Sequence, residues 1–447
     1  MANLQGCPEE IVESIVELLA LQDHCNLRRC SRTLACKATQ PRFGRYFNRK
    51  TVPLHIDALN EFVRVTEEGS QLGCLVQHLV IIGNAHEAHQ WDYGSERESR
   101  RRAATNNSNV SQRQSHDVAI GLLSRALVCI AAAHKQDQHS IKSLTLTISD
   151  TRKHPRSVPW NRHARKWRPI WLCAAFTFHV AMSSLAASQL RAEELSVFDD
   201  NPPVRCSLAC NVLEDTLKSV DLSVAFRSLK HLTLCFSDTE DSSKVQGLRR
   251  LLELTPSLQH LNLRQFSIGA GNLPGAQYDP TRESSYPARP GTYIMYCDAS
   301  WTTSPSVAPN RAQVFRNATE MAVIPRLERL TLCGIDTTGD DLLRFVRGSS
   351  PAEITLARVH LVSGTYMALF GYCSSESAHV QTHNFNDLAE ANWSVFFHAP
   401  DRFDTLQRSG AMVQTQISYH APVGAYRQAH QGQSEHRAEV KRLYGPI

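Results

Sequence analysis

A six-residue pattern, Leu-x-x-Leu-x-Leu, recurs through the middle of this chain and constrains its fold more than any other feature. In each copy the last two apolar residues alternate with polar ones, which is the periodicity of a strand with one buried face. The copies, the last of them the weakest, lie at residues 141–146, 217–222, 229–234, 258–263, 327–332 and 352–356. We therefore predict a series of short strands that share one core.

Leucines at helical spacing follow two of these predicted strands. The segments 245–254 and 340–346 each carry three or more apolar residues spaced three or four positions apart, as one face of a helix requires. The pattern thus alternates a strand with a helix. The interval from Leu232 to Leu261 is 29 residues, at the long end of the roughly 20–29 residues of a leucine-rich repeat.

This alternation resembles the leucine-rich repeat, in which a strand lines one face of a solenoid and a helix packs behind it. The asparagine that usually turns the chain after the strand is absent, and Ser237, Phe266 and Gly334 stand near its place. The resemblance implies an α/β fold with an irregular, curved solenoid over residues 51–400. The alternative is an ordinary α/β domain whose parallel strands are rich in leucine.

The first 48 residues predict three short helices. Ile11, Ile15, Leu18 and Leu19 fall on one face of a helix that begins near Pro8. A second helix is expected from Asp23 through Ala35, and a third, after a proline, over residues 42–47. Three small helices bury little between themselves, and an apolar surface left over on such a unit usually belongs to a partner.

This segment resembles an F-box, the module by which a substrate receptor docks on the Skp adaptor of a cullin–RING ubiquitin ligase, and it looks like the F-boxes common in filamentous fungi. Two residues depart from the family pattern: Cys7 stands where leucine is usual, and His24 replaces an apolar residue. The matching residues are Pro8, Glu10, Ile11, Ile15, Leu18, Leu19, Asp23, Leu27, Arg28, Ser31, Arg32 and Leu34.

The resemblance implies that residues 1–50 bind the Skp adaptor, and through it a cullin, while residues 51–400 hold a protein client. The chain would then be a non-catalytic subunit of the ligase, working by proximity. The expected adaptor-binding residues are Pro8, Glu10, Ile11, Ile15, Leu18, Leu19, Leu27, Cys30 and Leu34.

Two polar insertions are expected to interrupt the repeat region, at residues 86–116 and 269–310. The first is rich in Arg and Asn and reads as disordered. The second is rich in Pro, Gly and Ser but carries five aromatic residues, so that it either folds back on the repeats or contacts a client. Residues 401–447 are expected to form a polar C-terminal segment that is partly helical near 435–443.

A basic segment at residues 152–168 is a candidate surface for an acidic or phosphorylated client, because arginine binds phosphate bidentately and stacks on aromatic rings. A solvated loop is the alternative, and nucleic acid is not favoured, since the net charge of the whole chain is only +5. The basic residues are Arg152, Lys153, Arg156, Arg162, Arg165, Lys166 and Arg168.

Catalytic, metal and cofactor motifs are weak, so we expect no enzyme activity, metal or cofactor. His86 and His89 lack the spacing of the His-Glu-x-x-His zinc motif. Cys206 and Cys210 have no second pair at zinc-ribbon distance and are interpreted as core or loop thiols. The glycines at 269 and 271 precede no helix that could receive a phosphate.

The composition favours a cytoplasmic or nuclear protein. The N-terminus lacks the basic and apolar regions of a signal peptide, and the 13 cysteines are then reduced and mostly part of the core. The most apolar stretch, 170–190, is interrupted by Ser, Thr and His and predicts a buried helix, not a membrane span.

Two other functions stay open. One is a repeat scaffold whose F-box-like cap no longer joins a ligase, and Cys7 and His24 are its support in the sequence. The other is a hydrolase or dehydrogenase with an unrecognised site, for which no specific residue argues.

Overall fold

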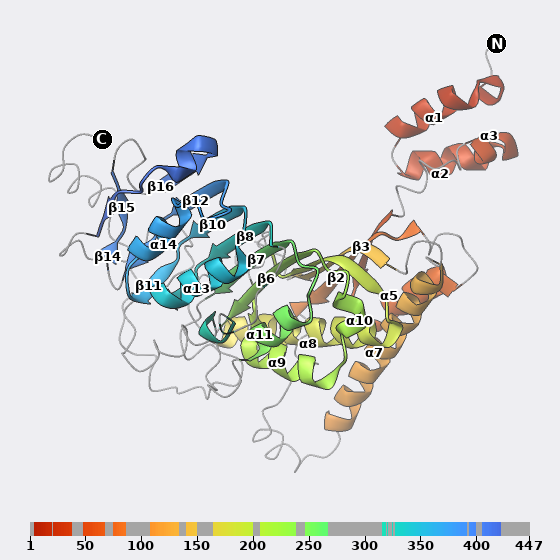
Figure 1. Cartoon of the computed structure of the whole chain (residues 1–447). Helices are drawn as coiled ribbons and strands as arrows, with labels where there is room; N and C mark the ends of the chain where they lie inside the picture. The colour runs from red at the N-terminus through yellow and green to blue at the C-terminus, as the bar shows by residue number, and fades with distance from the viewer. Residues whose placement is uncertain are drawn as a thin grey trace, which may run out of the picture.

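The computed structural model describes residues 4–19, 21–37, 48–67, 75–85, 108–133, 140–149, 164–199, 206–237, 246–266, 315–318, 320, 324, 327–390, 393–398 and 405–421. These residues form a mixed α/β structure with one large, mostly parallel sheet, and among them no barrel is closed. Figure 1 shows helices gathered along one side of this sheet and three N-terminal helices apart from it.

The N-terminal unit consists of a short 3₁₀ helix and three α-helices with a small core of their own. Val12 and Val16 form this core, Cys7 and Leu27 pack against it, and it is separate from the core of the sheet. The elements are η1 (Leu4–Gly6), α1 (Glu9–Leu18), α2 (Leu21–Cys30) and α3 (Arg32–Lys37).

The second expected helix, from Asp23 through Ala35, is two helices in the structure. Ser31 separates α2 from α3, because its Oγ accepts a hydrogen bond from the Leu34 N–H at 3.1 Å, which is how a serine caps a helix N-terminus. The third expected helix, over residues 42–47, lies outside the described residues.

Neighbours in the large sheet follow the order of the sequence, and every neighbouring pair is parallel except the last, β12 with β16. The strands are β1 (Arg49–Pro53), β2 (His78–Asn84), β3 (Ser140–Ser149), β4 (Arg191–Val197), β6 (His231–Ser237), β7 (His260–Phe266), β8 (Arg329–Cys333), β10 (Glu353–Ala357), β12 (Thr382–Asn386) and β16 (Thr405–Ser409), with β5 (Leu208–Ala209) beside β6.

Helices cross between successive strands. Because parallel crossovers share one hand, a strand order that never reverses places them on one face of the sheet, as Figure 1 shows. They are α5 (Ile56–Glu67), α7 (Ser108–Ala133), α8 (Ala164–Ser188), α9 (Cys210–Ser219), α10 (Ser223–Phe226), α11 (Gly247–Glu253), α13 (Gly339–Ser349) and α14 (Met367–Cys373).

Two rows of apolar side chains cross the sheet in register and form the centre of its core. Every member is at most 1% exposed. The first row is Leu79, Leu144, Leu195, Leu232, Leu261, Leu330 and Ile354, and the second is Ile81, Leu146, Val197, Leu234, Leu263, Leu332, Leu356, Phe385 and Leu406.

The turns after three neighbouring strands also lie in register. Gly334, Arg358 and Asp387 have φ values of 69°, 55° and 51°, and the backbone N–H of Gly334 and of Arg358 each donates to the last residue of the next strand, at 2.9 Å. Of the three positions where the sequence lacks asparagine, Gly334 is thus left-handed, whereas Ser237 and Phe266 are the last residues of β6 and β7. The strands that follow form a second sheet of β9 (Asp336–Thr338), β11 (His360–Ser363), β13 (Ala389–Glu390) and β14 (Trp393–Ser394).

Five of the six strand predictions are confirmed, as β3, β6, β7, β8 and β10, and the two helix predictions as α11 and α13. The prediction of a strand at 217–222 is wrong. Leu213 and Leu217 are four residues apart and both are buried on α9, so Leu217 belongs to a helical stripe and the chain then enters the turn before α10.

The expected limits of the insertions also change. Residues 108–116, predicted to be disordered, begin α7, whereas the second insertion, 269–310, lies outside the described residues.

The predicted polar segment 401–447 includes β16, η7 (Gly410–Gln414) and β17 (Tyr419–His420), and β17 pairs with β15 (Phe396–Phe397). Leu406, Val413 and Ile417 of this segment join the main core. The predicted helix near 435–443 is also outside the described part.

Two helices of the described chain are long and apolar enough to cross a membrane: α7 over His116–Ala133 and α8 over Ile170–Ser188. The α8 window is 72% buried inside the protein, as the sequence led us to expect of residues 170–190. The α7 window is only 33% buried.

Candidate interaction surfaces

The expected adaptor-binding residues divide between the outside and the inside of the N-terminal unit. Leu18 is 88% exposed and Ile11 50%, and they lie seven residues apart on one face of α1, with half-buried Ile15 between them. Pro8, Glu10 and Cys30 are also exposed, and Leu19 is half-buried. Leu34 is buried, and Leu27 packs against the Val12–Val16 core, so these two residues serve the fold of the unit itself.

A lysine fixes the start of this unit. The Lys37 ammonium, at the end of α3, donates to the carbonyl oxygens of Gln5 at 2.9 Å and of Cys7 at 2.6 Å. The residues before α1 are therefore held against α3 by polar contacts as well as by the small core. Cys7, which stands where the F-box pattern has leucine, is half-buried against Val12 and Val16.

The face of the sheet turned away from the helices, which we call the polar face, carries rows of hydrogen-bonding side chains. Because side chains alternate along a strand, each residue between the two buried apolar rows points to this face. The central row is Thr145, Ser196, Thr233, Asn262, Thr331, Thr355 and Asn384.

A charged row runs beside the central row across Glu194, His231, His260, Arg329 and Glu353. The two imidazoles stack with ring centroids 4.2 Å apart. Burial, and then the charge of His260, lower the pKa of His231 below its usual value, although Glu194 opposes the shift. Arg329 Nε donates to Glu353 at 2.5 Å, which lowers the pKa of that carboxyl group. This arrangement suits recognition of a polar surface.

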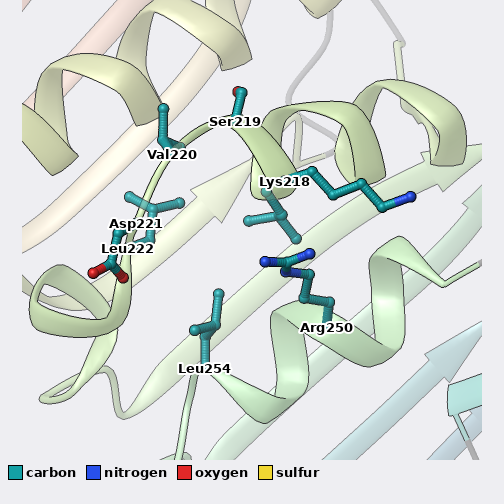
Figure 2. A pocket seen from close by; sticks show the side chains of 8 residues that line it. Lys218, Ser219, Val220, Asp221, Leu222, Arg250 and Leu254 are labelled. Atoms are coloured by element: carbon teal, nitrogen blue, oxygen red, sulfur yellow. The ribbon is translucent and has the colours of Figure 1, made fainter.

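The helical side of the sheet has two adjoining cavities, of about 240 and 320 Å³, that meet at Val220 and Asp221. Figure 2 shows the smaller cavity. In this view Arg250 of α11 points toward the end of α9, and the Asp221 side chain points away from Arg250. The Asp221 carboxylate accepts the Ser223 N–H at 3.0 Å. Sequence reasoning missed these cavities, because it placed residues 217–222 in a strand.

The wall between α9 and α11 depends on a buried carboxylate. Glu214 is 2% exposed and accepts hydrogen bonds from Lys218 Nζ at 2.5 Å and from the Gln246 N–H at 2.9 Å. The charge of Lys218 is thereby matched. The Arg250 guanidinium lines the smaller cavity.

The other candidate residues give no site in the described structure. Cys206 and Cys210 are 4% and 0% exposed, as expected of core thiols. His86 and His89 lie outside the described residues, as do Arg152, Lys153, Arg156 and Arg162. Arg165, Lys166 and Arg168 fall within α8, but their side chains are outside the described part. No group of three or more His, Cys, Asp or Glu residues in the described ranges could hold a metal ion.

In comparisons with known proteins, the chain matches no family model and no curated protein sequence.

Proposed function

We propose that this protein is a substrate receptor of an SCF-type ubiquitin ligase. In this proposal α1–α3 dock on a Skp adaptor, and the region from β1 onward is a leucine-rich-repeat-like solenoid that presents a protein client. The chain performs no covalent chemistry itself. It accelerates ubiquitin transfer by holding the client close to the conjugating enzyme.

One observation carries the proposal: a helical unit with its own core exposes large apolar side chains on one face of α1. Ile11 and Leu18 are 50% and 88% exposed, which is costly for side chains of this size unless a partner covers them. They are also two of the residues that match the apolar positions of the F-box pattern.

The sheet supports the second half of the proposal. Its parallel strands follow sequence order from β1 to β12, and their leucines lie in register from one strand to the next. A repeat solenoid requires this arrangement, because each repeat stacks on the one before it. An ordinary doubly wound α/β domain reverses its strand order near the middle, and no reversal occurs among the described strands.

The alternative is a repeat scaffold whose F-box-like cap no longer binds an adaptor. Cys7 favours this alternative, because it is half-buried inside the unit where the family pattern has a larger leucine. Adaptor binding therefore decides between the two functions.

The test is co-purification of the full chain with a fungal Skp adaptor, followed by titration of each variant. Burying a large apolar side chain contributes about 1.5–3 kcal/mol, and about 1.4 kcal/mol is a factor of ten in affinity. We therefore expect Leu18→Asp or Ile11→Asp to weaken adaptor binding at least tenfold. Both side chains are exposed, so the unit should remain folded.

Met367→Asp is the matched control, because Met367 is a 70% exposed apolar residue on α14, far along the chain from the N-terminal unit. It should bind the adaptor as the unaltered protein does. Failure of the unaltered protein to bind at micromolar adaptor would reject the ligase role and leave the scaffold function. Binding that survives Leu18→Asp would reject the assigned surface.

A further inference from the structure

Helix α7 has an apolar face that no described element covers. Val118 and Val128 are 43% and 47% exposed, and the window His116–Ala133 is apolar enough to cross a membrane although only 33% of it is buried. The opposite face of the helix, with Leu123, Leu127 and Ile130, lies in the core. The outer face also carries the exposed charged residues Asp117 and Arg125. Large apolar side chains gathered on an exposed surface usually mark a contact site.

The other helices of the same layer differ from α7 in their exposed residues. They expose charged residues, for example Arg64 of α5, Asp215 of α9 and Arg347 of α13. Where they expose a large apolar residue, it is a single one, such as Ile56 of α5, Val224 of α10 or Met367 of α14, whereas α7 exposes both Val118 and Val128. Helix α7 packs between α5 and α8, and Figure 1 shows it on the outside of the helical layer beside α5. Solvent alone therefore does not account for its composition.

The outward residues of α7 follow a seven-residue spacing. Val118, Arg125 and Ala132 are seven positions apart, and Gly121 with Leu122 and Val128 with Cys129 lie between them. This is the spacing of a seam along which a second helix lies. A Cβ placed on Gly121 would meet nothing within 4 Å, so a partner backbone could approach closely there.

We propose that this seam binds α7 of a second copy of the chain, in antiparallel orientation, to form a two-fold symmetric dimer. When the helices cross at Arg125, Val118 faces Ala132 of the second copy, Leu122 faces Val128 and Gly121 faces Cys129. Each pair sets a larger side chain against a smaller one, and the same patch serves both copies, as a two-fold interface requires.

The charges at the crossing point fit the same partner. Arg125 binds the carboxylate of Glu67 on α5 through three contacts of 2.9–3.1 Å. The axis would thus bring together two guanidinium groups and two carboxylates, so that the patch is complementary to itself. A single polar position in an apolar seam also fixes register and orientation at some cost in stability.

The expected dimer is weak. A single helix pair buries less surface than the roughly 1,200–2,000 Å² of a stable interface, so we expect a dissociation constant in the micromolar range. The dimer does not depend on the adaptor, and its failure would leave the proposed ligase function untouched.

Sedimentation of the full chain over a range from about 1 to about 100 µM tests the proposal. We expect a concentration-dependent shift from monomer to dimer that Val118→Asp or Val128→Asp weakens at least tenfold. Val224→Asp is the control, because Val224 is also an exposed valine, at 36%, but lies on α10. It should dimerise normally.

Crosslinking tests the orientation. Gly121→Cys should form an intermolecular disulfide with Cys129 of the second copy under a mild oxidant, and Gly121→Cys combined with Cys129→Ser should not. A parallel pairing would instead join the introduced thiol to the same introduced thiol of the second copy. The combined variant retains that thiol, so its crosslinking would overturn the antiparallel arrangement.

Two results would overturn the proposal altogether. One is a chain that remains monomeric at about 100 µM. The other is flotation with vesicles of neutral and anionic phospholipid that is lost in Val128→Asp, because the face would then serve a lipid surface.

Discussion

His116 sits at the α7–α8 contact, with its ring centroid 4.6 Å from that of Phe176. Burial lowers the pKa of His116 to about 4, the neighbouring His179 adds to the shift, and Asp117 opposes it. The unfolded chain has a histidine pKa of about 6.5. As the pH falls from about 6.5 to 4, the unfolded state therefore takes up a proton that the folded state refuses, and the free energy of unfolding decreases.

We predict that the free energy of unfolding falls by roughly 1–3 kcal/mol over this interval because of His116, less than the full shift allows since the ring is partly exposed. Urea unfolding at pH 7 and at pH 4, compared with the same measurement on His116→Gln, tests this fall. The variant should lose less stability on acidification. Some pH dependence should persist, because burial also lowers the pKa of His179. Equal losses in both proteins would contradict the assignment.

The turns between strands contain left-handed residues whose conformation the sequence does not indicate. The missing asparagine was evident, and Gly334 suits a left-handed turn. Arg358 and Asp387 occupy the equivalent places with φ of 55° and 51°, and nothing in an arginine indicates this conformation. Left-handed backbone costs such a residue about 1–2 kcal/mol. The Arg358 N–H bond to Asn386 and its guanidinium contact with Cys333 Sγ, both 2.9 Å, offset that cost.

At the scale of elements, the contact of β2 with α8 depends on a glycine. A Cβ built on Gly83 would clash with Thr177 Oγ1 and lie 2.7 Å from Cys173 Sγ, two side chains of α8, and 2.8 Å from Ile148 Cδ1 of β3. All three side chains are almost completely buried, so none can move aside freely. The absence of a side chain at Gly83 sets how closely α8 approaches the sheet.

Gly83→Ala should therefore lower the free energy of unfolding by about 1–3 kcal/mol, the usual cost of overpacking a core. Gly348→Ala on α13 is the control, since a Cβ there would meet nothing within 4 Å and alanine favours a helix by up to about 1 kcal/mol. Chemical denaturation of both variants measures the difference. A Gly83→Ala protein as stable as the control would show that α8 can shift away from β2.

Elements were predictable where one local pattern was unambiguous. The strands with two leucines in alternation were found, whereas β4 was missed because its first inward residue is the small Ala192. Residues 217–222 satisfied the strand pattern and yet end a helix. Six residues do not distinguish a strand from the end of a helical stripe that began at Leu213.

At the scale of the molecule, the sequence indicated repeated strands but not how far the sheet extends. The sheet continues through β1 and β2 on one side and through β12 and β16 on the other, where the leucine pattern fades. Lys50, His383 and Arg408 take up the positions of the first apolar row in those strands. These strands belong to the sheet because their backbones pair in register with neighbouring strands, and a local sequence pattern does not show such pairing.

The cores divide the molecule into two stability units. One continuous core runs from Val52 to Ile417, and the pair Val12 and Val16 forms a separate one. Because each unit buries its apolar residues independently, loss of packing in the sheet should not be felt in α1. The small core of the N-terminal unit should also make it the less stable of the two, since little apolar surface leaves water when it folds.

Hydrogen exchange of the full chain with Leu234→Ala tests this division. Leu234 is 0% exposed in the middle of the second apolar row, and truncating such a leucine costs about 2–5 kcal/mol. We expect faster exchange throughout β3, β6, β7 and β8, which share that core, and an unchanged rate in α1. Conversely, Val16→Ala should accelerate exchange in α1 and leave β6 as it was. Coupled acceleration of both regions would mean that the N-terminal helices pack on the sheet, and that an adaptor bound to α1 would also stabilise the region proposed to hold the client.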